Sequence, residues 1–113
     1  MSHDISFYRM TQVLYFQHYW FITVFFRHRF DYPEGNSFYL MKSDVEALLS
    51  ACKKVMEDHS LAEELLPLDG YGMDRYDEVY FQKVENAEKY IREKLLPVFD
   101  TLEGDIIEFS LSA

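Results

Sequence analysis

The stretch that decides the fold is Val13-Leu-Tyr-Phe-Gln-His-Tyr-Trp-Phe-Ile-Thr-Val-Phe-Phe26, in which eleven of fourteen residues are apolar or aromatic. Its β-branched and aromatic side chains suit a strand as well as a helix. A strand is usually only about 5–6 residues long, however, and no glycine or proline interrupts this run. Length therefore predicts a helix from about residue 12 to 29, with Thr11 as its N-cap.

Apolar residues would lie on nearly every side of this 12–29 helix. It is expected either to form the centre of the core or to carry an exposed aromatic face through which two chains form a homo-oligomer. Aromatic stripes at helical spacing are usually packing, which favours the core. The run is shorter than the roughly 20 apolar residues of a membrane-spanning helix, and Gln17 and His18 interrupt it. No membrane association is expected.

The rest of the chain alternates short strands with amphipathic helices. Alternating apolar residues predict strands at 4–10, 38–41 and 106–112. Two Ser-x-x-Glu capping boxes, at Ser43 and Ser60, predict helix starts, and a longer helix is expected from Asp77 to about Leu96. The sequence therefore predicts a single α+β domain over residues 1–113, with a small sheet of about three short strands packed against three main helices.

Two apolar stripes mark the buried faces of the predicted helices. The first contains Val45, Leu48, Leu49, Cys52, Val55 and Met56. The second contains Tyr80, Val84, Ala87, Ile91 and Leu95, with the pairs Glu85/Lys89 and Glu88/Arg92 on the solvated side. Because Cys52 lies within the first stripe, we expect a core thiol rather than a nucleophile.

Charge and cysteine content narrow the class of protein. The formal net charge is −9, and residues 31–113 hold nineteen acids against eight Lys and Arg. A surface of this sign repels phosphate backbones, so direct nucleic-acid binding is not expected. One cysteine cannot form an internal disulfide, and no secretion leader is recognisable, which together favour an intracellular, reducing location.

The segment Leu49-Ser-Ala-Cys-Lys-Lys-Val-Met-Glu-Asp-His-Ser-Leu-Ala-Glu-Glu-Leu-Leu-Pro67, followed by Tyr76-Asp-Glu-Val-Tyr-Phe81, resembles a family of small acidic uncharacterised proteins of bacteriophages and bacteria. The similarity extends more weakly to Tyr15–Phe26 and to the C-terminal strand. The family has no assigned activity, so the resemblance implies only a phage-related or bacterial accessory protein in the cytoplasm of a bacterial cell. After Pro67 the chain departs from the family, whose members carry a longer Gly- and Phe-rich segment there.

Aromatic and acidic residues gather between Pro67 and the start of the last helix. Tyrosine offers both apolar area and a hydroxyl group and is enriched at recognition surfaces. The group is therefore a candidate binding surface, consisting of Tyr71, Met73, Asp74, Tyr76, Asp77 and Tyr80. The alternative is that these aromatic side chains pack onto the core. The neighbouring acids do not have the spacing of an EF-hand loop, and Asp77 and Glu78 suit the first turn of a helix.

The chain contains no phosphate-binding loop, nucleophile elbow or zincin motif, and its four histidines are scattered. No catalytic residue, metal or cofactor is predicted. We expect a non-enzymatic protein that acts through protein–protein interaction with an unidentified protein partner. One variant is an acidic nucleic-acid mimic, in which carboxylates of residues 57–108, among them Glu85 and Glu88, occupy a DNA-binding protein. The alternative is a small-ligand binder or enzyme with a pocket near residues 69–81.

Overall fold

A four-stranded antiparallel sheet organises the chain. The computed structural model describes residues 3–9, 11–31, 35–70, 75–100 and 106–112. The strand order is β2-β1-β4-β3, so β4 lies between the β1–β2 hairpin and β3. The strands are β1 (Asp4–Arg9), β2 (Thr11–Gln17), β3 (Ser37–Met41) and β4 (Ile106–Ser112). The α+β class is confirmed, with four strands instead of the three predicted.

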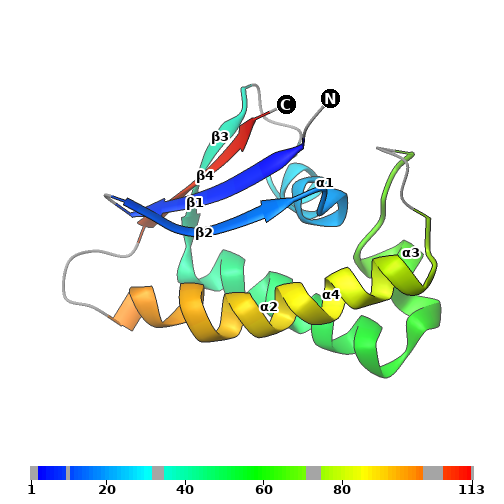
Figure 1. Cartoon of the computed structure of the whole chain (residues 1–113). Coiled ribbons are helices and arrows are strands. Elements are labelled where there is room, and N and C mark those ends of the chain that lie inside the picture. Colours follow the sequence, from blue (N-terminus) through cyan, green and yellow to red (C-terminus); the bar gives the residue numbers. More distant parts are fainter. Residues whose placement is uncertain (1–2, 10, 32–34, 71–74, 101–105, 113) are drawn as a thin grey trace.

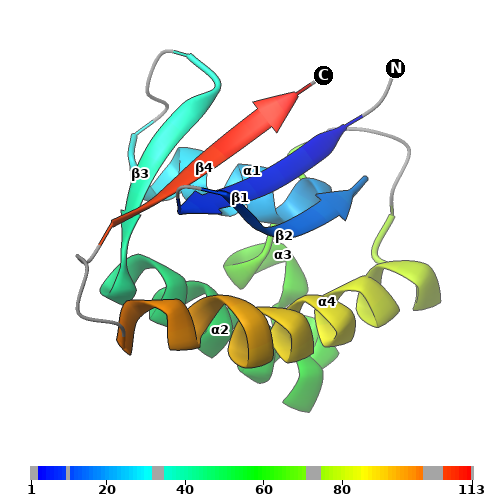
Figure 2. The same cartoon turned by 60° about the vertical axis from the view of Figure 1, so that its left-hand side comes forward.

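Helices cover one face of this sheet and leave the other open (Figures 1 and 2). The covering layer is built from α1 (Trp20–Arg29), α2 (Lys42–Glu57) and α4 (Glu78–Tyr90). Two short elements follow α2, namely η1 (His59–Leu61) and α3 (Ala62–Leu65). The last helix continues through η2 (Ile91–Leu95), a π-helical segment, and η3 (Leu96–Asp100), a 3₁₀ segment.

The core lies between the sheet and the helices. Side chains alternate along each strand, as the pleat requires, and the inward set is buried: Ile5, Phe7, Leu14, Phe16, Phe38, Leu40, Ile107, Phe109 and Leu111. Phe109 occupies the middle of this set. Its ring centroid lies 5.6 Å from that of Phe7, 5.5 Å from that of Phe26 in α1 and 5.2 Å from that of Phe38. Aromatic packing therefore joins the two central strands, one edge strand and a helix.

The predicted helix over residues 12–29 is wrong in its first half. Residues 11–17 form the edge strand β2, in which Leu14 and Phe16 are buried and Tyr15 and Gln17 are exposed. Only residues 20–29 are helical. The core assignment of the aromatic helix is nevertheless confirmed for α1, because its apolar side chains Phe21, Ile22, Val24 and Phe26 are buried.

The break between strand and helix falls at His18. This residue has a φ of +64°, a left-handed conformation that glycine or asparagine more commonly adopts. Its amide donates a hydrogen bond to the carbonyl oxygen of His3, 2.7 Å away, which satisfies the backbone at the end of the hairpin. The chain therefore turns without glycine or proline, and the length argument that favoured one long helix failed because it required such a residue.

Both predicted capping boxes are wrong in detail. The first helix turn after β3 begins one residue before Ser43, and the carboxylate of Asp44 accepts the backbone N–H of Met41 at 2.8 Å. In the second case Asp58 precedes the predicted cap and accepts from the backbone N–H of Ser60 at 3.0 Å and from its hydroxyl at 2.6 Å. Asp58 therefore takes the place of the predicted serine as the N-cap acceptor. Asp44 has the reciprocal role in a capping box whose N-cap is Met41, because its side chain accepts from the N-cap backbone.

The helical stripes are confirmed with one exception. All five members of the second stripe are buried, and five of the first are, whereas Met56 is 38% exposed. The Glu88/Arg92 pair forms at 2.9 Å between Oε1 and Nε, but its prediction on the solvated side is wrong for Glu88, which is buried.

Pro97 is predicted from the sequence to end or kink the last helix. It does not end the helical segment, because η3 continues to Asp100. The sequence also predicts a turn from residue 101 to 105 around Gly104, and these residues lie outside the described ones.

None of the described helices is both long and apolar enough to cross a membrane.

Candidate functional site

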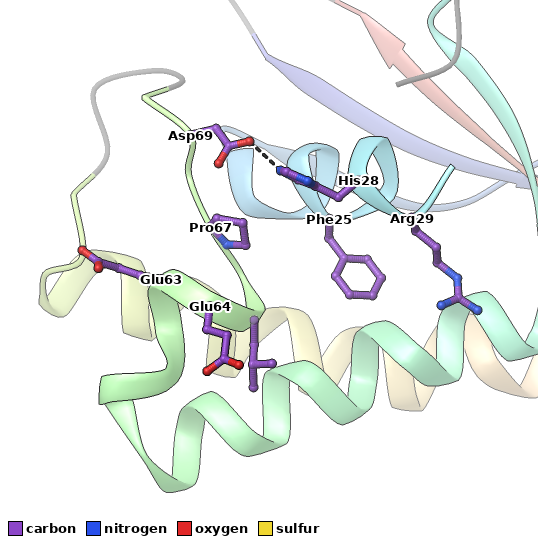
Figure 3. A pocket seen from close by; sticks show the side chains of 8 residues that line it. Phe25, His28, Arg29, Glu63, Glu64, Pro67 and Asp69 are labelled. Carbon is purple, nitrogen blue, oxygen red and sulfur yellow. Dashed lines mark hydrogen bonds and ion pairs between the residues drawn. The ribbon is translucent and has the colours of Figure 1, made fainter. Parts of the chain in front are cut away.

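A surface pocket of about 520 Å³ opens between α1 and α3. Figure 3 shows that α1 supplies one wall and that α3 with the chain after it supplies the other. Its lining combines apolar side chains with charged ones. The lining residues are Phe25, His28, Arg29, Glu63, Glu64, Leu65, Pro67 and Asp69.

One rim of the pocket is an ion pair between α1 and the segment after Pro67. The Nε2 atom of His28 lies 2.6 Å from Oδ2 of Asp69. Asp69 has a φ of +53° and is followed by Gly70 at +77°, so the chain bends sharply where this carboxylate leaves it. Figure 3 shows the Asp69 side chain directed toward the imidazole. The contact ties the segment after α3 to the last turn of α1.

The positive charge on the opposite rim is neutralised from outside the pocket. The Nε atom of Arg29 donates to Oδ1 of Asp44 at 2.7 Å. The second oxygen of this buried carboxylate caps α2 through the N–H of Met41. With Arg29 paired in this way, the carboxylates of Glu63 and Glu64, both exposed, dominate the charge of the pocket.

The pocket belongs to a strongly acidic end of the molecule. Residues 57–78 contain eight Asp and Glu against a single Arg and no Lys, a net charge of −7 out of −9 for the chain. The end of α2, η1, α3 and the start of α4 lie together there (Figure 1), and the His59 and Phe81 rings stack at 3.7 Å. Among the described residues of this acidic end, the exposed acids are Glu57, Asp58, Glu63, Glu64, Asp69, Asp77 and Glu78.

The described members of the tyrosine group predicted as a binding surface have structural contacts. Tyr80 is fully buried, and its hydroxyl donates to the carbonyl oxygen of Leu66 at 2.8 Å. The hydroxyl of Tyr76 accepts the backbone N–H of Leu68 at 2.8 Å. Asp77 caps α4, accepting the backbone N–H of Tyr80 at 3.1 Å.

These contacts correspond to the packing alternative for Tyr76, Asp77 and Tyr80. The ring centroids of Tyr76 and Tyr80 lie 5.1 Å apart in an edge-to-face arrangement. This contact holds the segment after α3 against α4. Burial raises the pKa of the Tyr80 hydroxyl, and the nearby Tyr76 and Cys52 raise this pKa further. Tyr71, Met73 and Asp74 lie outside the described residues, and a binding role for the group stays a prediction.

The pocket residues were not predicted from the sequence, apart from Asp69 as an acid of the loop. Phe25 and Glu63 are far apart in the chain and meet only because α1 and α3 approach each other in the fold. The sequence run Arg27-His28-Arg29 predicts a basic helix end that complements the helix dipole, and these residues do form the last turn of α1. Its pairing with Asp69 had no sequence signal beyond the Asp69-Gly70 turn.

Among the described residues, no group of three or more His, Cys, Asp and Glu side chains is arranged to hold a metal ion.

Cys52 is buried, and the loss of hydration raises the pKa of its thiol from 9.0 to about 12, with a further contribution from the charge of Glu88. We expect native Cys52 to react with a charged disulfide reagent far more slowly than in urea, because the folded chain holds no thiolate near neutral pH. The unfolded chain releases the thiol proton of Cys52 at a lower pH than the folded chain does. The contribution of the protonated thiol to folding stability is therefore fully present below pH 9 and is lost between pH 9 and about 12. Equal thiol reactivity in the native and unfolded states would contradict this burial.

No family model, no curated protein and no solved structure matches this chain. The resemblance to small acidic phage and bacterial proteins therefore stays a prediction, and function is inferred from the geometry of the pocket.

Proposed function

We propose that this chain is a non-enzymatic accessory protein of a phage or bacterium that binds a basic protein partner through its acidic end. The observation that carries the proposal is the pocket between α1 and α3, in which the apolar side chains of Phe25, Leu65 and Pro67 lie beside the carboxylates of Glu63 and Glu64. An arginine or lysine side chain matches both parts. Its methylene stem packs on apolar surface while its cationic end pairs with carboxylates, and a guanidinium also stacks favourably on a phenylalanine face.

The charge around the pocket would assist this binding. A net charge of −7 within residues 57–78 attracts a basic surface over a Debye length of about 8 Å and raises the rate of encounter. One class of basic partner is a DNA-binding protein whose phosphate-binding surface the carboxylates would occupy. Glu88 is a poor test of that variant, because it is buried and paired with Arg92.

A titration with N-acetyl-L-arginine amide, followed by amide NMR shifts, tests the pocket directly. Saturable shifts centred on Phe25, Leu65 and Asp69 are expected. Replacing Glu63 and Glu64 by glutamine should remove them.

The control for this titration is the double substitution of Glu85 and Glu93 by glutamine. It removes the same two charges from exposed positions of α4 and η2 that do not line the pocket. The control should retain the shifts. Equal loss in both variants would mean that the ligand responds only to net charge, and the pocket assignment would then be wrong.

Capture from a bacterial lysate tests the partner class with the same pair of variants. A basic protein that is retained by the wild type and the Glu85/Glu93 variant, but not by the Glu63/Glu64 variant, is the expected result. Competition by duplex DNA would identify the nucleic-acid mimic. Retained proteins that do not depend on Glu63 and Glu64 would contradict the proposed surface.

A second candidate function is favoured by one specific contact, the His28–Asp69 pair. A histidine oriented by an aspartate at the rim of a pocket is an arrangement used for general-base catalysis. The described residues that line this pocket include no serine, threonine or cysteine that such a base would activate. The His28→Ala variant separates the two functions, because it would abolish an enzymatic activity while leaving the carboxylates Glu63 and Glu64 that bind the basic side chain.

A further inference from the structure

The outer edge of β2 presents unpaired backbone groups. The amide of His18 donates to the carbonyl oxygen of His3, which identifies this pair as hydrogen-bonded. Bonded and non-bonded pairs alternate in an antiparallel ladder, so Phe16 and Leu14 also bond to β1. The N–H and C=O groups of Tyr15 and Gln17 consequently point away from the sheet.

The hydrogen bonds between β3 and β4 lead to the same assignment of which residues of β1 bond to β2. The amide of Leu111 donates to the carbonyl oxygen of Asn36, which makes the odd-numbered positions of β4 bond to β3. Its even-numbered positions then bond to β1 at Asp4, Ser6 and Tyr8. The odd-numbered positions of β1 are left for β2, in agreement with the His3–His18 bond.

A groove of about 450 Å³ runs beside this edge. One wall is the four consecutive residues Leu14–Gln17 of β2, and the other comes from Tyr90 and Lys94 at the junction of α4 and η2. Both cartoons show β2 as the strand lying along this helix (Figures 1 and 2). An edge strand facing a helix across a groove is the geometry in which an extended peptide adds a strand to a sheet.

Two lysines lie at the helix side of the groove. Lys94 is the one charged side chain among the described residues that line it. Its ammonium group lies 5.3 Å from the centroid of the Tyr90 ring, and that of Lys89 lies 5.9 Å from the same ring. On the strand side, the carboxylate of Asp4 accepts the hydroxyl of Tyr15 at 2.9 Å. The lysines therefore lie on the helix side of the groove, where they favour a ligand that carries a carboxylate.

We propose that the β2 edge groove binds an extended peptide segment of a partner protein, and that an Asp or Glu side chain of this peptide pairs with Lys94. The peptide backbone hydrogen-bonds to the outward N–H and C=O groups of Tyr15 and Gln17. An aromatic or aliphatic peptide side chain packs between Tyr19 and Tyr90. This site is separate from the acidic end and has the opposite charge preference, so either proposal can fail without the other.

Selection of displayed random decapeptides on the immobilised protein tests the inference. Enrichment of sequences that combine an acidic residue with apolar residues is expected. Binding of one such synthetic peptide should protect the amide protons of Tyr15 and Gln17 from exchange with solvent, which a purely side-chain interaction would not do.

Two variants with matched controls test the backbone and the charge separately. Gln17→Pro removes an outward N–H without breaking the β1 ladder, and Tyr39→Pro does the same on the other edge of the sheet. Lys94→Glu reverses the charge of the groove, and Lys53→Glu reverses an exposed charge on α2. Gln17→Pro and Lys94→Glu should each weaken the peptide by about tenfold, and the two controls should bind as the wild type does.

Three results would overturn the proposal. The selection could enrich no acidic peptide, or a selected peptide could bind the Gln17→Pro and Lys94→Glu variants as well as the controls. Alternatively, light scattering could show a dimer of the wild type that Gln17→Pro dissociates. In that case a second copy of the chain occupies the β2 edge. If Gln17→Pro fails to fold, two other measurements test the proposal. These are the exchange protection of the Tyr15 amide by the peptide, and the comparison of peptide binding to Lys94→Glu and Lys53→Glu.

Discussion

Replacing Phe109 by alanine is expected to lower the free energy of unfolding by about 3–5 kcal/mol. The side chain is fully buried, and its ring contacts those of Phe7, Phe26 and Phe38. These neighbours come from β1, α1 and β3, so truncation leaves a cavity that no single element can move to fill. Urea unfolding followed by circular dichroism measures the change.

Tyr39→Ala is the control for this truncation. Tyr39 lies on β3, one strand away, but its side chain is on the open face of the sheet and is 68% exposed. Tyr39→Ala should therefore lower the free energy of unfolding by much less than Phe109→Ala does. If the two substitutions had similar effects, the inner face of the sheet would not be the principal core.

Removing the carboxylate of Asp44 should cost about 2–3 kcal/mol. Its two oxygens accept from Nε of Arg29 at 2.7 Å and from the backbone N–H of Met41 at 2.8 Å. Hydrogen bonds to charged groups contribute roughly 1.5–3 kcal/mol each, and the partial exposure of Arg29 reduces the sum. Asp44→Ala loses both contacts, whereas Asp44→Asn keeps an acceptor for Met41 and should lose less.

The matched control is Glu46→Ala, which removes an exposed carboxylate from the same first turns of α2. This substitution should leave the urea midpoint nearly unchanged. An Asp44→Ala variant as stable as Glu46→Ala would show that the contact between the end of α1 and the start of α2 adds nothing to the stability of the fold.

The sequence predicted best those elements whose buried residues repeat at a regular interval. The stripes along α2 and α4 and the alternation in β4 depend only on the local geometry of a helix or a strand. The stretch Val13–Phe26 was mispredicted because apolar residues occur at almost every position, which hides both periods. A left-handed histidine divides it, and no composition rule identifies such a turn.

The two candidate binding surfaces were less predictable than the fold. The pocket beside Phe25 and the groove beside Tyr15 each combine residues from elements distant in sequence. Composition indicated the acidity of residues 57–78 but not which carboxylates adjoin apolar side chains. The tyrosines near Asp77 were conspicuous in the sequence, yet Tyr80 and Tyr76 make contacts that hold the chain in place.

The position of β4 in the middle of the sheet has a consequence for biosynthesis. Asp4 pairs with Ser112, so the sheet closes only through a contact between segments more than a hundred residues apart. While the ribosome is still adding residues before 106, β3 has no strand to pair with, and β1 lacks its strand partner on the side away from β2. Nascent chains would therefore expose these strands until synthesis passes β4, a period in which chaperones would compete with aggregation.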